Sequence, residues 1–318
     1  MAIIQITRNY SNTILLSRGL TDFLKFTAAV MVAFGHYAGY ALTFTDNLVY
    51  RLTTTFAGTL GVAIFFLLSG YGLMKSELNR HQDLLLFIKK RLAKVYLPVV
   101  LISFIWQVIL WPKGAGVSHL PKLLYATFWG FSDGVLWFVK AIMICYILFR
   151  VYLLFRGISR KAGFVSLVIG TSIVYALVYY YFADWAAIGI PLFSLGILLA
   201  DYKDKLSDLL KSWWMLLIIL LLTIFYVILD HYSEGNLYLK ALCNWYVVIS
   251  LLMLCVRYKI DIATPRWMGD FSYDLYITHN KVINYCKPLC SYIGFWRFTL
   301  FTIIVAYLFY LLRKFLKI

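Results

Sequence analysis

Apolar residues occur along this chain in long runs that short polar connections separate. A helix crosses the hydrocarbon core of a bilayer with roughly 20 largely apolar residues. On this length rule the sequence predicts ten membrane-spanning helices, at about residues 20–43, 56–75, 93–111, 135–155, 162–182, 185–200, 213–230, 237–256, 267–287 and 293–312. No long linker, low-complexity tract or clear repeat interrupts the series. We therefore expect an all-α bundle, formed as one domain over residues 1–318 with no appended soluble domain.

The composition agrees with a membrane protein. Hydrophobic residues make up 63% of the 318 residues, charged residues only 14%, and the mean hydropathy is +0.81. So few charges could not cover the apolar surface of a soluble domain. The first twenty residues contain only short apolar runs and no small-residue cleavage site. We expect the first span to serve as the insertion signal and to remain in the mature protein.

The net charge of +16 is explained by topology. With the N-terminus placed in the cytoplasm, 21 of the 30 Lys and Arg residues fall in inner segments and 7 in outer segments. Cytoplasmic segments of membrane proteins carry this excess. The split predicts an even number of spans with both termini inside, and it requires no nucleic-acid partner.

The five cysteines indicate neither a zinc site nor a disulfide framework, because their number is odd and none forms a CxxC pair. Cys286 and Cys290 stand one helical turn apart and could form a bridge, although unpaired thiols are favoured. No metal site is expected.

The first predicted span, "TDFLKFTAAVMVAFGHYAGYAL", contains two ionisable residues eleven positions apart. At about 100° per residue, Lys25 and His36 share one helix face, roughly 16 Å apart along the axis. Lys25 either snorkels to the inner headgroups, paired with Asp22, or faces the interior. An ionisable group inside the membrane is costly and usually faces a bundle interior or a wet cavity. His36 is therefore a functional candidate, the alternative being a hydrogen-bonded packing residue.

A second histidine lies at a similar predicted depth, in "MGDFSYDLYITHN" of the ninth span. His279 follows an unusually polar helix start that includes Tyr273. This pattern predicts a helix that lines an internal polar cavity.

Other candidates lie at the predicted inner ends of the second and third spans. "FFLLSGYGL" places Ser69 and Gly70 near the depth of Lys25, and the glycine lets two helix backbones approach closely. "FIKKRLAKVYLP" follows directly. Its cations, among them Lys90, Arg91 and Lys94, fit either the positive-inside bias or a site for a phosphate-bearing ligand from the cytoplasm.

"VLWFVKAIMICYILF" begins the fourth span. Trp137 fits an interfacial anchor and Lys140 could snorkel outward. Alternatively, Trp137 and Lys140 line the acceptor side of a cavity together with Tyr273.

Six stretches in order resemble the membrane-bound acyltransferase-3 family, integral-membrane O-acetyltransferases of bacterial surface polysaccharides. They are "LTDFLKFTAAVMVAFGHY", "VAIFFLLSGYGL", "FIKKRLAKVYLP", "LWFVKAIMICYILF", "PLFSLGILLADYKDKL" and "MGDFSYDLYITH". The sequence contains no Walker loop, GxSxG elbow or HExxH motif that would indicate a soluble-type nucleotide or hydrolase fold.

The resemblance implies transfer of an acyl group, usually acetyl from acetyl-CoA, to a hydroxyl of a cell-surface or lipid-linked glycan such as an exopolysaccharide. No cofactor would be bound permanently. The family carries an arginine, ten residues and a histidine in its first span. Here Lys25 and His36 keep that spacing, but lysine lacks the bidentate guanidinium. The resemblance implies a catalytic His36 and places Arg91 on the donor side.

Several alternatives stay open. His36 is either a base or a transient acyl carrier, and His279 could orient it, act as a second base or line the cavity. The expected location is the bacterial inner membrane, with polysaccharide-synthesis proteins as candidate partners. A transporter of glycan or lipid-linked sugar is the alternative function, and a subunit without activity of its own is the third.

Overall fold

The structure is a computed structural model of the whole chain. It describes residues 6–8, 16–45, 47, 49–50, 53, 57–110, 119–130, 134–182, 184–215, 217–218, 221, 224, 237–258, 260–286 and 292–318.

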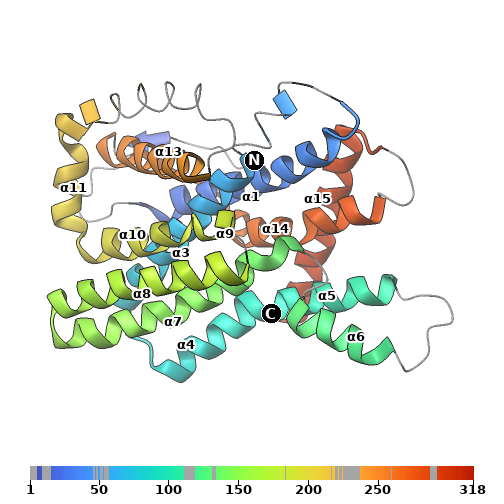
Figure 1. Cartoon of the computed structure of the whole chain (residues 1–318), viewed down its shortest axis with the longest axis horizontal. Helices are drawn as coiled ribbons and strands as arrows, with labels where there is room; N and C mark the ends of the chain where they lie inside the picture. The colour runs from blue at the N-terminus through green and yellow to red at the C-terminus, as the bar shows by residue number, and fades with distance from the viewer. Residues whose placement is uncertain are drawn as a thin grey trace.

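Helices dominate the described chain, as Figure 1 shows. They are α1 (Arg18–Ala41), α3 (Gly58–Asn79), α4 (Leu84–Arg91), α5 (Leu97–Ile109), α6 (Leu120–Tyr125), α7 (Trp137–Ile158), α8 (Arg160–Tyr181), α9 (Asp184–Ala187), α10 (Ile190–Asp201), α11 (Lys203–Lys211), α13 (Leu237–Arg257), α14 (Trp267–Cys286) and α15 (Phe295–Phe315). The predicted all-α class is confirmed.

Among the described residues, five helical segments are long and apolar enough to cross a membrane. They are Gly58–Asn79, Leu84–Ile109, Trp137–Ile158, Arg160–Tyr181 and Phe295–Phe315. The other predicted spans also coincide with helices, except the one at about 213–230, most of which lies outside the described residues. The total of ten spans and the side on which the termini lie stay predictions.

The predicted span at 185–200 is not one helix. The chain forms α9, turns, and begins α10 at Ile190 with Pro191 in its first turn. A proline has no backbone N–H, and its ring clashes with the carbonyl four residues earlier. Pro191 therefore breaks the helix after Ala187.

The predicted span at 93–111 belongs to a longer helix that begins at Leu84. Asp83 caps this start, because its carboxylate accepts a 2.7 Å hydrogen bond from the Leu86 N–H. Between α4 and α5 the helix widens into a π-helical turn, Leu92–Tyr96. Pro98 follows this turn and cannot pair with the Lys94 carbonyl. The proline thus accounts for the local widening.

The helix α14 carries much of the polar interior. α14 packs against α1 and α15, and it holds Asp274, His279 and Lys281 with no exposed surface. These charges explain why α14 is not among the five most apolar helices. The predicted span at 267–287 coincides with α14, and the Lys281 side chain is enclosed within the protein.

Close backbone contact joins α3 to α10. A Cβ atom built on Gly70 would lie 1.9 Å from the Phe193 carbonyl oxygen, and one on Gly196 would lie 2.1 Å from the Leu67 carbonyl oxygen. Only glycine permits this approach from either side. The packing role predicted for Gly70 is therefore confirmed.

Two buried ion pairs tie helix ends together. The Arg313 guanidinium donates to both carboxylate oxygens of Asp274 at 2.6 and 2.7 Å, joining α15 to α14. Arg156 likewise donates to Asp201 through Nε at 2.7 Å, joining α7 to α10. Arg313 and Arg156 are thus each paired with a carboxylate of a neighbouring helix.

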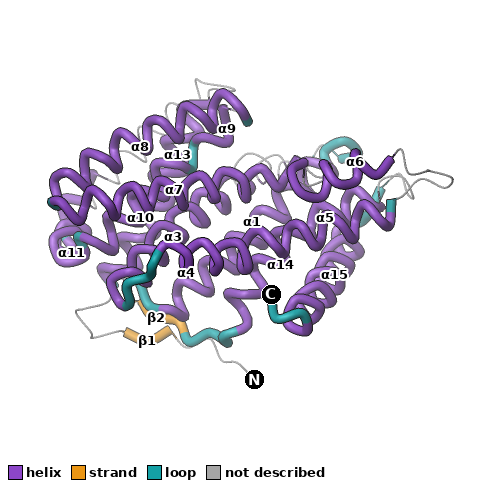
Figure 2. Tube along the Cα trace, turned by 90° about the horizontal axis from the view of Figure 1, so that it is seen from below, coloured by secondary structure: helices purple, strands orange, loops and turns teal. Residues whose placement is uncertain are grey.

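A small element of sheet lies outside the helical pattern. β1 (Ile6–Arg8) pairs antiparallel with β2 (Ile260–Ile262), at the end of the molecule opposite α6 in Figure 2. The strands have three residues each, too few for an alternating pattern to show in the sequence.

Candidate active site

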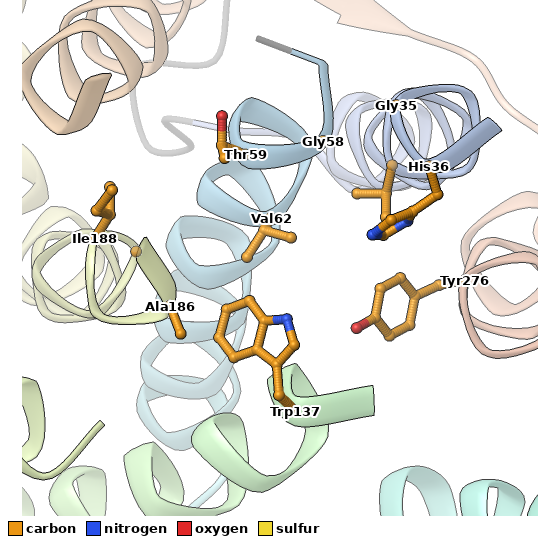
Figure 3. A pocket seen from close by; sticks show the side chains of 11 residues that line it. Gly35, His36, Gly58, Thr59, Val62, Trp137, Ala186, Ile188 and Tyr276 are labelled. Atoms are coloured by element: carbon orange, nitrogen blue, oxygen red, sulfur yellow. The ribbon is translucent and has the colours of Figure 1, made fainter. Parts of the chain in front are cut away.

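Two cavities meet at Tyr276, on α14. The first, which we call the His36 cavity, measures about 200 Å³ and is shown in Figure 3; its lining includes His36, Thr59, Val62, Trp137, Ile188 and Tyr276. The second, the Arg91 cavity, measures about 310 Å³; its lining includes Lys25, Phe65, Ser69, Arg91, Phe138, Tyr273 and Tyr276. α1, α3, α7 and α14 contribute to both.

His36 of α1 and His279 of α14 form a hydrogen-bonded pair. The His36 Nδ1 and His279 Nε2 atoms are 2.9 Å apart, and the rings stack with centroids 5.0 Å apart. His279 Nδ1 lies 2.6 Å from the Tyr276 carbonyl oxygen, which can only accept. The proton of a neutral His279 must therefore be on Nδ1, so that Nε2 accepts the His36 Nδ1–H.

This chain of hydrogen bonds selects the His36 tautomer. With its proton on Nδ1, neutral His36 has its lone pair on Nε2. His279 is fully buried and does not occur among the lining residues of either cavity, whereas His36 lines the His36 cavity. Of the two histidines, His36 is therefore the one that opens to a cavity, and His279 is in contact with it from behind the cavity wall.

Aromatic rings converge on His36. In Figure 3 the ring of Tyr276 comes from one wall and the indole of Trp137 from another, and both point to the space beneath the His36 ring. Trp137 begins α7, as the sequence predicted, and its indole nitrogen is turned toward His36 and Tyr276. An apolar wall with a few polar atoms is typical of a site for a small or extended ligand.

Lys25 lies in the other cavity. Its Nζ atom is 3.8 Å from the Asp22 carboxylate, and Arg18 approaches the same carboxylate at 3.7 Å. The predicted pairing with Asp22 is thus present, and Lys25 also lines the Arg91 cavity. Lys25 and His36 lie on one helix but open to different cavities.

Arg91 lies against aromatic rings. Its guanidinium carbon is 5.4 Å from the Phe87 ring centre and 5.6 Å from that of Tyr146, both within cation–π range. Its Nε atom is buried and donates to no residue in the described part of the chain. The stacking holds the guanidinium at the cavity wall, where a phosphate or carbonyl oxygen could accept a hydrogen bond from it.

The π-helical turn shapes the wall next to Arg91. A π turn leaves a backbone carbonyl without its usual partner, and the Val95 carbonyl accepts a 2.6 Å hydrogen bond from the Tyr273 hydroxyl. Val95 and Tyr273 both line the Arg91 cavity. The sequence placed Tyr273 on the acceptor side, whereas the structure groups it with the donor-side candidates Arg91 and Ser69.

Three predicted site cations do not occur among the described lining residues of the two cavities. Lys90 donates to Gln82 at 3.3 Å, and Lys94 is exposed. Lys140 lies 5.9 Å from the centre of the Trp129 ring. Of the cations in the "FIKKRLAKVYLP" stretch, Arg91 alone is among the described lining residues of these two cavities.

Tyr276, Phe65 and Phe138 were not predicted as site residues. Tyr276 stands three residues before His279, so helical spacing alone places it on the same face, one turn away. No spacing in the sequence marks Phe65 and Phe138 as site residues, because aromatic residues occur throughout the chain.

Comparison with protein families gives a match over most of the chain. Residues 21–313 match the sequence model of the acyltransferase-3 family (Acyl_transf_3), which is described as an acyltransferase domain. No curated protein and no solved structure matches the chain.

Proposed function

Since the chain belongs to the acyltransferase-3 family, we propose that it is a multi-pass inner-membrane enzyme that transfers an acetyl or similar short acyl group from acyl-CoA to a hydroxyl of a cell-surface or lipid-linked glycan. The observation that carries the proposal is the pair of cavities that meet at Tyr276, one lined by His36 and the other by Arg91 and Lys25.

The Arg91 cavity is the donor side of this proposal. Arg91 and Lys25 line this cavity, and their positive charge would attract the phosphates of the donor. With the predicted topology, Lys25 lies toward the cytoplasm, where acyl-CoA is made. The nucleotide end of the donor stays at this mouth, and the thioester extends toward Tyr276.

The His36 cavity is the acceptor side. Nε2 of His36 removes the proton from the glycan hydroxyl while the hydroxyl oxygen attacks the thioester carbonyl carbon. A C–O bond forms and the C–S bond breaks. The proton on Nε2 then passes to the departing thiolate, which leaves as free CoA, and His36 returns to its neutral form.

His279 is a positioning residue in this reaction. It accepts the His36 Nδ1–H and is itself held by the Tyr276 carbonyl, so the basic nitrogen of His36 remains Nε2. An imidazolium formed at His36 is stabilised by the same hydrogen bond. The direction of this chain favours an orienting role over a second base.

The rival function is a glycan or lipid-linked-sugar transporter. It would also use a polar cavity, but it has no need for a histidine whose tautomer is selected. Release of free CoA from acyl-CoA by membranes that contain the chain separates the two, because a transporter consumes no thioester.

The test is mass spectrometry of surface glycans from cells that carry His36→Ala. We expect loss of the mass of one acyl group per modified sugar, at an unchanged protein level. His81→Ala is the matched control, because His81 is a largely exposed histidine at the end of α3 that pairs with Glu77. Unchanged acylation in His36→Ala would remove His36 from the mechanism.

Lys25→Arg tests the donor side. If Lys25 contacts the donor, the substitution should change the donor KM and leave the acceptor KM as it was. Equal changes in both constants would place Lys25 outside the donor site.

A further inference from the structure

Three aromatic rings lie where the two cavities meet. Phe65 of α3, Phe138 of α7 and Tyr276 of α14 are all nearly or fully buried, and all three line the Arg91 cavity. Their neighbours along the helices, Val62 and Trp137, line the His36 cavity. The rings therefore lie at the boundary.

The three rings lie close to one another. The centroids of Phe65 and Tyr276 are 5.9 Å apart, those of Phe138 and Tyr276 5.5 Å, and those of Phe65 and Phe138 5.9 Å. The centre of this triangle is about 3.3 Å from each centroid, so a carbon atom there would already be near the contact distance of about 3.5–4.0 Å from ring carbons of all three. A carbon chain can therefore pass between the rings only in contact with all three, and a bulkier group requires one of them to turn.

The three rings contact one another in favourable orientations. The Tyr276 ring meets Phe65 at 61° and Phe138 at 74°, close to the edge-to-face arrangement that aromatic pairs favour. Phe138 is also supported from behind by Phe66, whose ring centroid is 4.8 Å away. The rings thus form a tightly packed cluster rather than a loose lining.

We propose that Phe65, Phe138 and Tyr276 form a barrier that the acyl end of the donor must displace to reach His36, and that this barrier selects short acyl groups. The inference rests on the proposed acyl transfer, and it names the residues that decide which acyl chain is transferred. An acetyl group needs a small ring movement. Each further methylene needs a larger one, and the packing of Phe66 resists it.

The test compares acetyl-, propionyl- and butyryl-CoA, each labelled in the acyl group, with inverted membrane vesicles that hold the chain and its native glycan acceptors. We expect the unaltered protein to transfer butyryl at least tenfold more slowly than acetyl, since one methylene in a fitted pocket changes selectivity roughly 10- to 200-fold. Phe65→Leu and Phe138→Leu should each raise the butyryl-to-acetyl ratio about tenfold or more.

Phe149→Leu is the matched control. Phe149 is a buried phenylalanine of α7, like Phe138, but it packs on Phe87 and does not occur among the described lining residues of either cavity. Its butyryl-to-acetyl ratio should equal that of the unaltered protein. Size-exclusion profiles in detergent establish that each variant is folded.

Several results would overturn the inference. One is transfer of acetyl and butyryl at equal rates by the unaltered protein. This measurement does not depend on the folding of any variant. Another is an unchanged ratio in folded, active leucine variants. Absence of transfer from all three donors by the unaltered protein, with no CoA released, would instead overturn the proposed function itself.

Discussion

A single added methyl group should separate α3 from α10. In Gly70→Ala the new Cβ would lie 1.9 Å from the Phe193 carbonyl oxygen, whereas a Cβ atom practically never comes within 3.0 Å of another residue's atoms. The obstacle is backbone, not the end of a flexible side chain. The two helices must therefore move apart by about 1 Å, or one must tilt.

The loss in free energy of unfolding follows from the packing contacts that this movement weakens. A gap of 0.5–1 Å forfeits about a quarter to a half of each dispersion contact, and a buried leucine makes some 40–60 contacts of about 0.1–0.2 kcal/mol. Phe66, Leu67, Phe193 and Ile197 lie buried at or beside this contact. For about a hundred loosened contacts, we expect Gly70→Ala to destabilise the protein by on the order of 4 kcal/mol.

Gly72→Ala provides the comparison on the same helix. A Cβ on Gly72 meets nothing within 4 Å, and alanine favours a helix by about 0.8–1.0 kcal/mol over glycine. We expect no loss of stability. Because Gly72 lines the Arg91 cavity, the comparison concerns stability and not activity.

The assay is thermal unfolding of purified protein in detergent, followed by tryptophan fluorescence. At roughly 2–4 °C per kcal/mol, Gly70→Ala should lower the apparent Tm by about 10 °C, and Gly72→Ala should leave it unchanged or slightly raised. Equal Tm values for the two variants would refute the reasoning, because they would show that α3 and α10 are not held at backbone contact.

Three further predictions concern the buried charges and the site. Arg313→Met leaves the Asp274 carboxylate buried without its partner and should cost about 3–5 kcal/mol, measured by the same unfolding assay, with part of the loss restored when Asp274→Asn is added. His279→Ala should lower kcat by about 100-fold or more and leave both KM values unchanged, since the side chain is not among the described lining residues of either cavity; a KM effect without a kcat effect would contradict the positioning role. Pro98→Ala lets the π turn relax, so Tyr273 loses its acceptor carbonyl; steady-state kinetics should show a higher donor KM, and an equal rise in the acceptor KM would count against this.

Much of the bundle follows from local sequence. The apolar runs predicted most of the described helices, and the one predicted span that is divided contains Pro191. The spacing of Lys25 and His36 correctly placed them on one helix at two levels. The Ser-Gly pair at the end of the second span indicated close packing, which Gly70 shows.

The candidate site was predictable only in part. His36, Arg91, Lys25, Ser69 and Trp137 line the two cavities, as ionisable or polar residues inside a span would. Lys90, Lys94 and Lys140 resemble them in sequence but lie elsewhere. A cluster of cations shows that a helix end is basic, and it does not show which cation faces inward.

The sequence alone determined that this chain is a helical membrane protein, where its helices run, and that a histidine lies within the first of them. Only the tertiary structure brought His279 beside His36, 243 positions away in the chain, and Phe65 and Phe138 against Tyr276. The physical reason lies in the solvent. A helix in lipid is apolar on its outer face as well as its inner one, so its sequence carries little sign of which face meets a neighbour. The tautomer of His36 and the barrier between the cavities are properties of that packing.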